Sequence, residues 1–154
     1  VCNLRPESRG HVHIKTEDSR EPPKIQPDYL SDPADRKVAA DAIKLTRKIV
    51  SSPAMKKFEP EEFKPGIEFA SDDDLAREAG NIGTTIFHPV GTCKMGPSSD
   101  NMAVVDERLK VHGIRGLRVV DASVMPTITS GNTNSPTLMI AEKASEMILE
   151  DAPS

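Results

Sequence analysis

A single histidine in a loop rich in glycine and proline is the strongest candidate for chemistry in this sequence. The loop reads Phe87-His88-Pro89-Val90-Gly91-Thr92-Cys93-Lys94-Met95-Gly96. Pro89 fixes the backbone beside the imidazole, and Gly91 allows another group to approach closely. A histidine held in this way can accept a proton near neutral pH. The alternative is a buried histidine that only satisfies loop carbonyls.

A second polar cluster follows the histidine loop after one segment that resembles a strand. It reads Ser130-Gly131-Asn132-Thr133-Asn134-Ser135-Pro136-Thr137. Asn134 is a good helix N-cap, and Pro136 two residues later supports a helix start there. A helix N-terminus also offers free N–H groups and a partial positive charge, which stabilise an anion. We therefore expect one site built from both clusters.

Two other groups of side chains allow different chemistry. Cys93 lies close to His88 in sequence, so a cysteine–histidine nucleophile is one hypothesis; a small buried hydrophobe is the other. His11 and His13 would lie on one face of a strand and could provide two metal ligands. A solvated strand face explains the same pair, since no third ligand is evident. We predict no metal site.

The elements expected before residue 86 are a strand and two helices. Residues 11–14 alternate as a strand does, and the polar, proline-rich residues 16–32 predict extended, irregular chain. A helix is expected from Asp32 to Ser51, because Asp32 is a good N-cap with Pro33 after it. Its apolar stripe would comprise Val38, Ala42, Leu45 and Ile49. A second helix is expected over 72–79, capped by Ser71 and stopped by Gly80.

The elements expected after residue 86 are two short strands and a final helix. Residues 104–106 and 117–121 both read as strands, the second of them buried. His112 lies in a glycine-containing turn and is expected to be exposed. The last helix is expected over 136–149.

Composition restricts the classes of function. The chain has 154 residues, no Trp, 3% aromatic residues and 13 prolines, which suggests packing against polypeptide or cofactor outside it. The net charge of −4 and the lack of a basic stripe argue against nucleic-acid binding. No apolar run approaches the roughly 20 residues of a membrane span. Two distant cysteines favour a reduced, cytoplasmic protein. The oligomeric state is open.

Three stretches resemble the C-terminal part of the glucose–methanol–choline (GMC) family of flavin-dependent oxidoreductases. They are residues 88–96, residues 111–126 (Val-His-Gly-Ile-Arg-Gly-Leu-Arg-Val-Val-Asp-Ala-Ser-Val-Met-Pro) and residues 130–143. Weaker similarity extends to residues 5–10 and 25–31. The resemblance covers nearly the whole chain, and the details look most like choline and general alcohol dehydrogenases.

The resemblance implies an α+β fold. It predicts part of a substrate-binding domain over 1–85, with an antiparallel sheet and helices. An active-site loop and connection would follow over 86–116, and the C-terminal strand and helix of a Rossmann-like FAD domain over 117–154. The Gly-x-Gly-x-x-Gly loop that cradles FAD phosphates in this family is not in the sequence. We therefore expect this chain to be a fragment that needs an N-terminal FAD-binding portion as its partner.

The resemblance also implies a reaction and its residues. Family members oxidise a small-molecule alcohol to a carbonyl by hydride transfer to flavin N5. His88 matches the catalytic histidine, which takes the hydroxyl proton. Asn134 matches the second active-site position, where members carry His or Asn, and would hydrogen-bond the substrate oxygen. The matching FAD contacts are Asp121, Ala122, Asn134, Ser135, Pro136 and Thr137. A non-catalytic fragment or interaction module without bound FAD is the alternative function.

Overall fold

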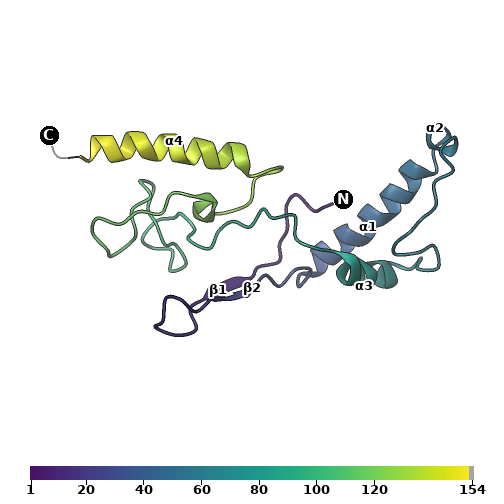
Figure 1. Ribbon diagram of the computed structural model, residues 1–154, viewed down its shortest axis with the longest axis horizontal. Helices are drawn as coiled ribbons and strands as arrows, with labels where there is room; N and C mark the ends of the chain where they lie inside the picture. The colour runs from purple at the N-terminus through teal and green to yellow at the C-terminus, as the bar shows by residue number, and fades with distance from the viewer. Residues whose placement is uncertain (153–154) are drawn as a thin grey trace. The chain divides into compact units, whose positions relative to one another are not determined.

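The computed structural model describes residues 1–152, and the chain folds as two units, Val1–Thr85 and a second that begins at Ile86 (Figure 1). The first unit contains a small antiparallel sheet and three helices, α1 to α3. The second contains one turn of 3-10 helix and the helix α4. Each unit is described by itself below.

The sheet of the first unit is a two-stranded antiparallel pair. Strand β1 spans His11–His13 and pairs with β2, Lys24–Gln26, so that His13 lies opposite Lys24. The predicted strand at 11–14 is therefore confirmed, one residue shorter. Residues 16–32 were expected to be extended and irregular, and the structure differs in that residues 24–26 pair as the strand β2. Its three residues stand between Pro23 and Pro27, and backbone pairing with β1 makes them a strand although all three side chains are exposed.

Helix α1, Pro33–Val50, begins where the sequence predicts. The Asp32 carboxylate accepts a hydrogen bond from the Ala34 N–H at 2.7 Å, and Ser51 is the C-cap. The predicted apolar stripe, however, is not the buried face: Val38, Leu45 and Ile49 are 41%, 57% and 56% exposed. Periodicity gives a helix an apolar face but does not say which face the rest of the chain covers. In this unit α3 packs against α1, and the buried residues of α1 are Asp35 and Ala40.

Two shorter helices complete the first unit. Helix α2 is one turn, Pro53–Lys56, and α3 spans Asp72–Ile82. The hydroxyl of Ser71 accepts a hydrogen bond from the Asp74 N–H, as expected for an N-cap. The predicted stop at Gly80 is wrong: the helix continues to Ile82, with Gly83 as C-cap. A glycine inside a helix lowers the stability of the helix by about 1 kcal/mol relative to alanine. Packing of one face of α3 offsets this loss, since Leu75 is completely buried.

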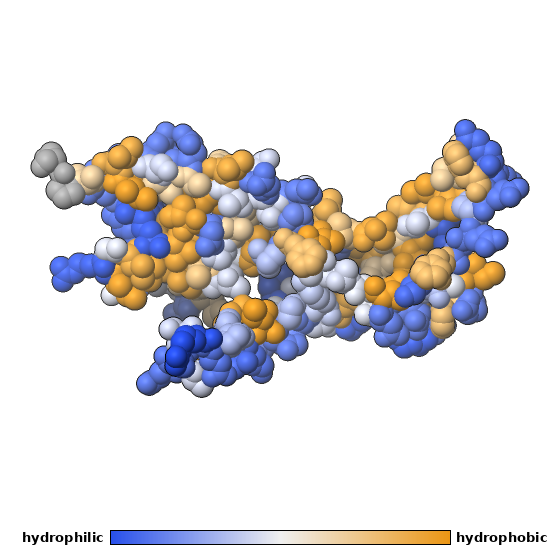
Figure 2. All heavy atoms as spheres, in the orientation of Figure 1, coloured by the Kyte–Doolittle hydropathy of each residue, from blue (hydrophilic) through white to orange (hydrophobic). Residues whose placement is uncertain are grey.

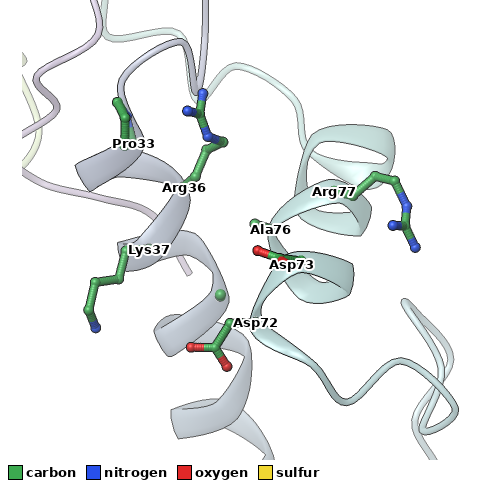
Figure 3. A pocket seen from close by; sticks show the side chains of 8 residues that line it. Pro33, Arg36, Lys37, Asp72, Asp73, Ala76 and Arg77 are labelled. Atoms are coloured by element: carbon green, nitrogen blue, oxygen red, sulfur yellow. The ribbon is translucent and has the colours of Figure 1, made fainter.

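A groove between α1 and α3 is lined by paired charges (Figure 3). Arg36 donates hydrogen bonds to the carbonyls of Leu30 and Ser31, both at 2.8 Å. Lys37 pairs with Asp41 and Arg77 with Asp74. Each of these cations thus has a partner on its own helix or in the segment just before it, and the groove contains none of the predicted site residues.

The buried carboxylate of Asp35 attaches the N-terminal segment to α1. Asp35 is 3% exposed and accepts hydrogen bonds from Asn3 Nδ2 at 2.9 Å, the Glu7 N–H at 3.0 Å and the Ser8 N–H at 2.7 Å. Burial raises the pKa of this carboxyl, but hydrogen bonds from Ser8 and Glu7 together with the charge of Arg9 outweigh it, so the pKa lies below its usual value.

Asp35→Asn is expected to destabilise the protein by about 1–3 kcal/mol, because an amide NH₂ would then face backbone donors that lose their acceptor. Thermal unfolding measures the change, with the exposed, ion-paired Asp41→Asn as control, expected within about 0.5 kcal/mol of the parent. The pKa is lowered in the fold, so this stabilisation is present above the unfolded pKa of about 3.9 and is lost as pH falls through the folded value. Equal losses in the two variants would contradict the anchoring role.

The second unit is built on a small apolar core. Its buried residues are Val105, Leu109, Val124, Met125, Ile140 and Ala144. The 3-10 turn, Ala122–Val124, contributes Val124, and α4, Asn134–Glu150, contributes Ile140 and Ala144. Among the described residues, no helix is both long and apolar enough to cross a bilayer.

The two predicted strands of the second unit are not formed. Residues 117–121 pair only once, in the bridge between Arg118 and Lys110, and Val105 makes isolated bridges to Met95 and Val111. A strand requires a hydrogen-bonded neighbour along its length. Two backbone hydrogen bonds flank the bridge, from the Val111 N–H to the Leu117 carbonyl at 3.0 Å and from the Val119 N–H to the Leu109 carbonyl at 3.2 Å. Within residues 1–152, no second bridge extends this pairing along 117–121, so a regular strand is not formed.

Three cations hold the C-terminal end of α4. Asp151, the C-cap residue, pairs with Lys110 at 2.6 Å, with Arg108 at 3.2 Å and with Arg118. Hydrogen bonds from Lys110 and Arg118 and the charge of Arg108 lower the pKa of Asp151 to about 2. A carboxylate at a helix C-terminus is opposed by the helix dipole. The three ion pairs stabilise the Asp151 carboxylate against the helix dipole and connect the end of α4 to residues 108–118.

Candidate active site

The backbone around His88 is held in an unusual conformation. Phe87 has a φ of 61°, in the left-handed region that costs a non-glycine residue about 1–3 kcal/mol. Gly91 has a φ of 86°, and a Cβ placed there would lie 3.3 Å from the carbonyl oxygen of Met125. The expected close approach at Gly91 is therefore confirmed. The approaching group is backbone of the same unit.

The histidine loop is attached to the 3-10 turn. The Cys93 N–H donates to the Ser123 carbonyl at 3.0 Å, and the Met95 N–H donates to the Val124 carbonyl at 2.8 Å. Val124 is completely buried. The turn is itself fixed by Asp121, whose carboxylate accepts from the Ser123 N–H at 2.8 Å. These bonds place the loop against the core of the second unit.

Helix α4 begins two residues earlier than the sequence predicts. Asn134 is its first residue, and Thr133 is the N-cap. The prediction of Asn134 as N-cap is therefore wrong by one position. The Thr133 carbonyl accepts from both the N–H and the hydroxyl of Thr137, at 3.0 and 2.7 Å, so the first turn closes on Thr133.

The two polar clusters meet at one hydrogen bond. Thr133 Oγ1 lies 3.0 Å from His88 Nδ1, and Thr133 is only 8% exposed. His88 itself is half-buried, and Asn134, the next residue after its partner, is exposed. The structure thus brings the histidine loop to the start of α4, as the sequence predicts. Sequence reasoning had assigned no role to Thr133, because threonine in a polar cluster gives no signal of its own.

The remaining predicted residues surround this contact in different ways. Ser135 is exposed, and Pro136 and Thr137 are half-buried in the first turn of α4. Ala122 is half-buried in the 3-10 turn, and Asp121 is exposed with one carboxylate oxygen on Ser123. Among residues 1–152, no hydrogen bond or ion pair joins Asp121 to His88 or Asn134, so their roles toward a cofactor stay predictions.

The alternative chemistries receive little support from the geometry. The nitrogen of His88 that has a hydrogen-bond partner contacts Thr133, not Cys93. The rings of His11 and His13 lie side by side, with centroids 4.8 Å apart, and His11 Nδ1 is 3.9 Å from Asp28. Among residues 1–152, no group of three or more His, Cys, Asp or Glu side chains is placed to hold a metal ion.

His112 is less exposed than the sequence suggests. Its Nε2 lies 3.1 Å from the carbonyl oxygen of Gly96, and the side chain is half-buried. Lys94 forms an ion pair with Asp100 at 2.7 Å in the same region. These contacts fix the far end of the histidine loop, so His112 has a structural explanation.

The start of α4 fits an anionic cofactor. The first N–H groups of a helix have no intrahelical partner, and the Thr133 side chain does not cap them. The N–H groups of Asn134 and Ser135 therefore present a partial positive charge at an exposed end of the helix. These donors, beside the exposed Asn134 amide, suit the polar edge of a flavin ring.

The chain belongs to the GMC oxidoreductase family, whose C-terminal family model matches residues 6–141. It is 46% identical to an alcohol dehydrogenase [acceptor] of Pseudomonas putida over 97% of this chain and 27% of that protein. It is 47% identical to an oxygen-dependent choline dehydrogenase of Cronobacter sakazakii over 99% of this chain and 27% of that protein. The chain thus spans about a quarter of the length of these relatives.

Solved structures share this fold. Pyridoxine 4-oxidase from Mesorbium loti matches with a TM-score of 0.84 and 32% identity, over 97% of this chain and 29% of that one. An FAD-dependent oxidoreductase from Chaetomium thermophilum matches with a TM-score of 0.90 and 29% identity, over 97% of this chain and 26% of that one. The helices and the small antiparallel sheet of this chain are therefore those of GMC oxidoreductases.

Proposed function

We propose that this chain provides the substrate- and flavin-contacting part of an FAD-dependent alcohol oxidoreductase. The observation that supports this most directly is the 3.0 Å contact between His88 and Thr133. It supports the proposal because His88, the candidate base, contacts the residue that precedes Asn134, the candidate hydrogen-bond donor to the substrate oxygen. Relatives called alcohol and choline dehydrogenases support an alcohol as substrate.

The residues of the chain have distinct roles in this proposal. His88 accepts the hydroxyl proton at Nε2, since its Nδ1 is already engaged with Thr133. Asn134 donates its amide N–H to the substrate oxygen as negative charge develops there. FAD, when bound, supplies the acceptor of the hydride that leaves the same carbon. The first turn of α4, Asn134 to Thr137, and residues Asp121 and Ala122 hold the cofactor.

The proposal includes the rest of the protein. Residues 1–85 would belong to the substrate-binding domain, and residues 117–154 to a Rossmann-like FAD domain completed by an N-terminal portion. Hydrophobic side chains exposed along α1 and α4 (Figure 2) suit burial against that portion. The same exposed hydrophobic side chains would suit a non-catalytic interaction module equally well. A measurement of the reaction itself must therefore distinguish the two functions.

The test uses the full-length protein. It is expected to purify with bound flavin, seen by its visible absorption, and to be bleached under anaerobic conditions by one or more alcohols of a panel that includes choline. Bleaching without oxygen reports transfer to flavin directly and does not depend on the final electron acceptor. A protein that binds no flavin, or whose flavin no alcohol bleaches, would favour the interaction module.

A further inference from the structure

Thr133 is an N-cap whose hydroxyl does not cap its helix. A threonine at this position usually accepts a hydrogen bond from the second or third N–H of the helix. In α4 the third residue is Pro136, which has no N–H, and the Thr133 side chain makes no capping bond to the second, Ser135. The local sequence thus leaves the hydroxyl available for another partner.

The released hydroxyl is directed at His88. Its oxygen lies 3.0 Å from Nδ1 in a position that is 8% exposed, so water competes little for the contact. The Thr133 backbone is fixed by two hydrogen bonds from Thr137 to its carbonyl. The hydroxyl therefore has a defined place, and the His88 ring is oriented by it.

The contact can form in two ways, and they have opposite consequences. If Nδ1 carries the proton, it donates to Thr133 Oγ1 and leaves a lone pair on Nε2. If instead the hydroxyl donates to Nδ1, the neutral ring carries its proton on Nε2 and cannot accept another there.

We propose that Thr133 is a positioning residue that accepts a hydrogen bond from His88 Nδ1–H and so keeps Nε2 free to take a proton. The choice of the Nδ1–H tautomer rests on the proposed function, whereas the contact between Thr133 and His88 does not. When Nε2 receives the substrate proton, Nδ1 still carries its own, so the same bond to Thr133 persists through the step. The ring need not rotate, and its orientation is fixed before and after proton transfer.

Thr133→Val in the full-length protein tests the inference, because valine keeps the shape and removes the hydroxyl. The rate of alcohol-dependent flavin reduction is expected to fall about tenfold, which is the loss of one hydrogen bond, with little change in KM. Thr133→Ser, which keeps the hydroxyl, should restore most of the rate. Thr46→Val, an exposed threonine on α1, is the matched control and should behave as the parent.

A second measurement is independent of catalysis. In protein with ¹⁵N-labelled histidine, the ring-nitrogen chemical shifts report which nitrogen of His88 is protonated, with the His88→Ala spectrum as assignment. The parent and Thr133→Ser are expected to show the Nδ1–H form, and Thr133→Val a larger share of Nε2–H. An Nε2–H parent, or an unchanged tautomer ratio in Thr133→Val, would overturn the inference. If the tautomer follows Thr133 while no alcohol bleaches the flavin, the proposed function fails and the positioning role stands.

Discussion

Replacement of His88 by alanine in the full-length protein is expected to slow alcohol-dependent flavin reduction by roughly 10²–10⁴-fold. The imidazole is the side chain that the loop, the 3-10 turn and Thr133 jointly hold in place. Its removal takes away the proposed acceptor of the alcohol proton. Stopped-flow absorbance at the flavin band measures the rate directly.

The His88→Ala experiment needs flavin content and a second histidine as controls. Flavin should remain bound, because the proposed cofactor contacts lie in the 3-10 turn and the start of α4. His13→Ala, at an exposed position of β1, should reduce its flavin as fast as the parent. Added imidazole should recover part of the rate lost in His88→Ala. If that variant binds flavin and is bleached at the parent rate, His88 is not the base.

The starts of α1 and α3 were predictable from the sequence because a cap is a local property. Asp32 before Pro33 and Ser71 before three aspartates each satisfy backbone donors within a few residues, and the structure confirms both caps. The His88 loop was predictable for the same reason, since Pro89 and Gly91 constrain the chain where they stand.

Properties that depend on distant partners were not predictable. The apolar stripe of α1 is exposed because α3 covers a different face, and no local signal specifies that choice. The sequence of residues 117–121 predicts a strand, but a strand also needs a neighbouring segment that pairs with it along its length. Within the described part of the chain, this run forms one bridge only, between Arg118 and Lys110. Thr133 has one property of each kind, local and long-range. Its cap position is local, but its contact with His88 joins residues 45 apart in sequence.

The observed start of α4 bears on the proposed function, because it moves Asn134 from the predicted N-cap to the first position of the helix. As an N-cap, Asn134 would have its side chain occupied by the helix backbone. As the first residue of α4, with Thr133 in the cap position, it has an exposed amide that can be directed to a ligand. The corrected position thus favours the proposed role of Asn134 more than the predicted one did.

Asn134→Ala is therefore expected to lower the rate of flavin reduction by roughly 10²–10³-fold, the cost of removing one donor to a developing negative charge. Stability should change little, because an exposed first position of a helix tolerates alanine. Asn134→His, which still offers an N–H, should retain more activity than alanine. Asn134→Asp should retain the least, because its carboxylate repels the same charge. The rate is measured by anaerobic stopped-flow absorbance.

The controls separate chemistry from folding at this position. Asn81→Ala, an exposed asparagine in α3, should match the parent in rate and in melting temperature. The double variant His88→Ala/Asn134→Ala should lose less than the product of the two single losses, because both side chains act on one transition state. Fully multiplicative losses would indicate independent roles. An Asn134→Ala protein with parental rate would remove Asn134 from the site and leave the free N–H groups of α4 as candidate stabilising donors at this helix start.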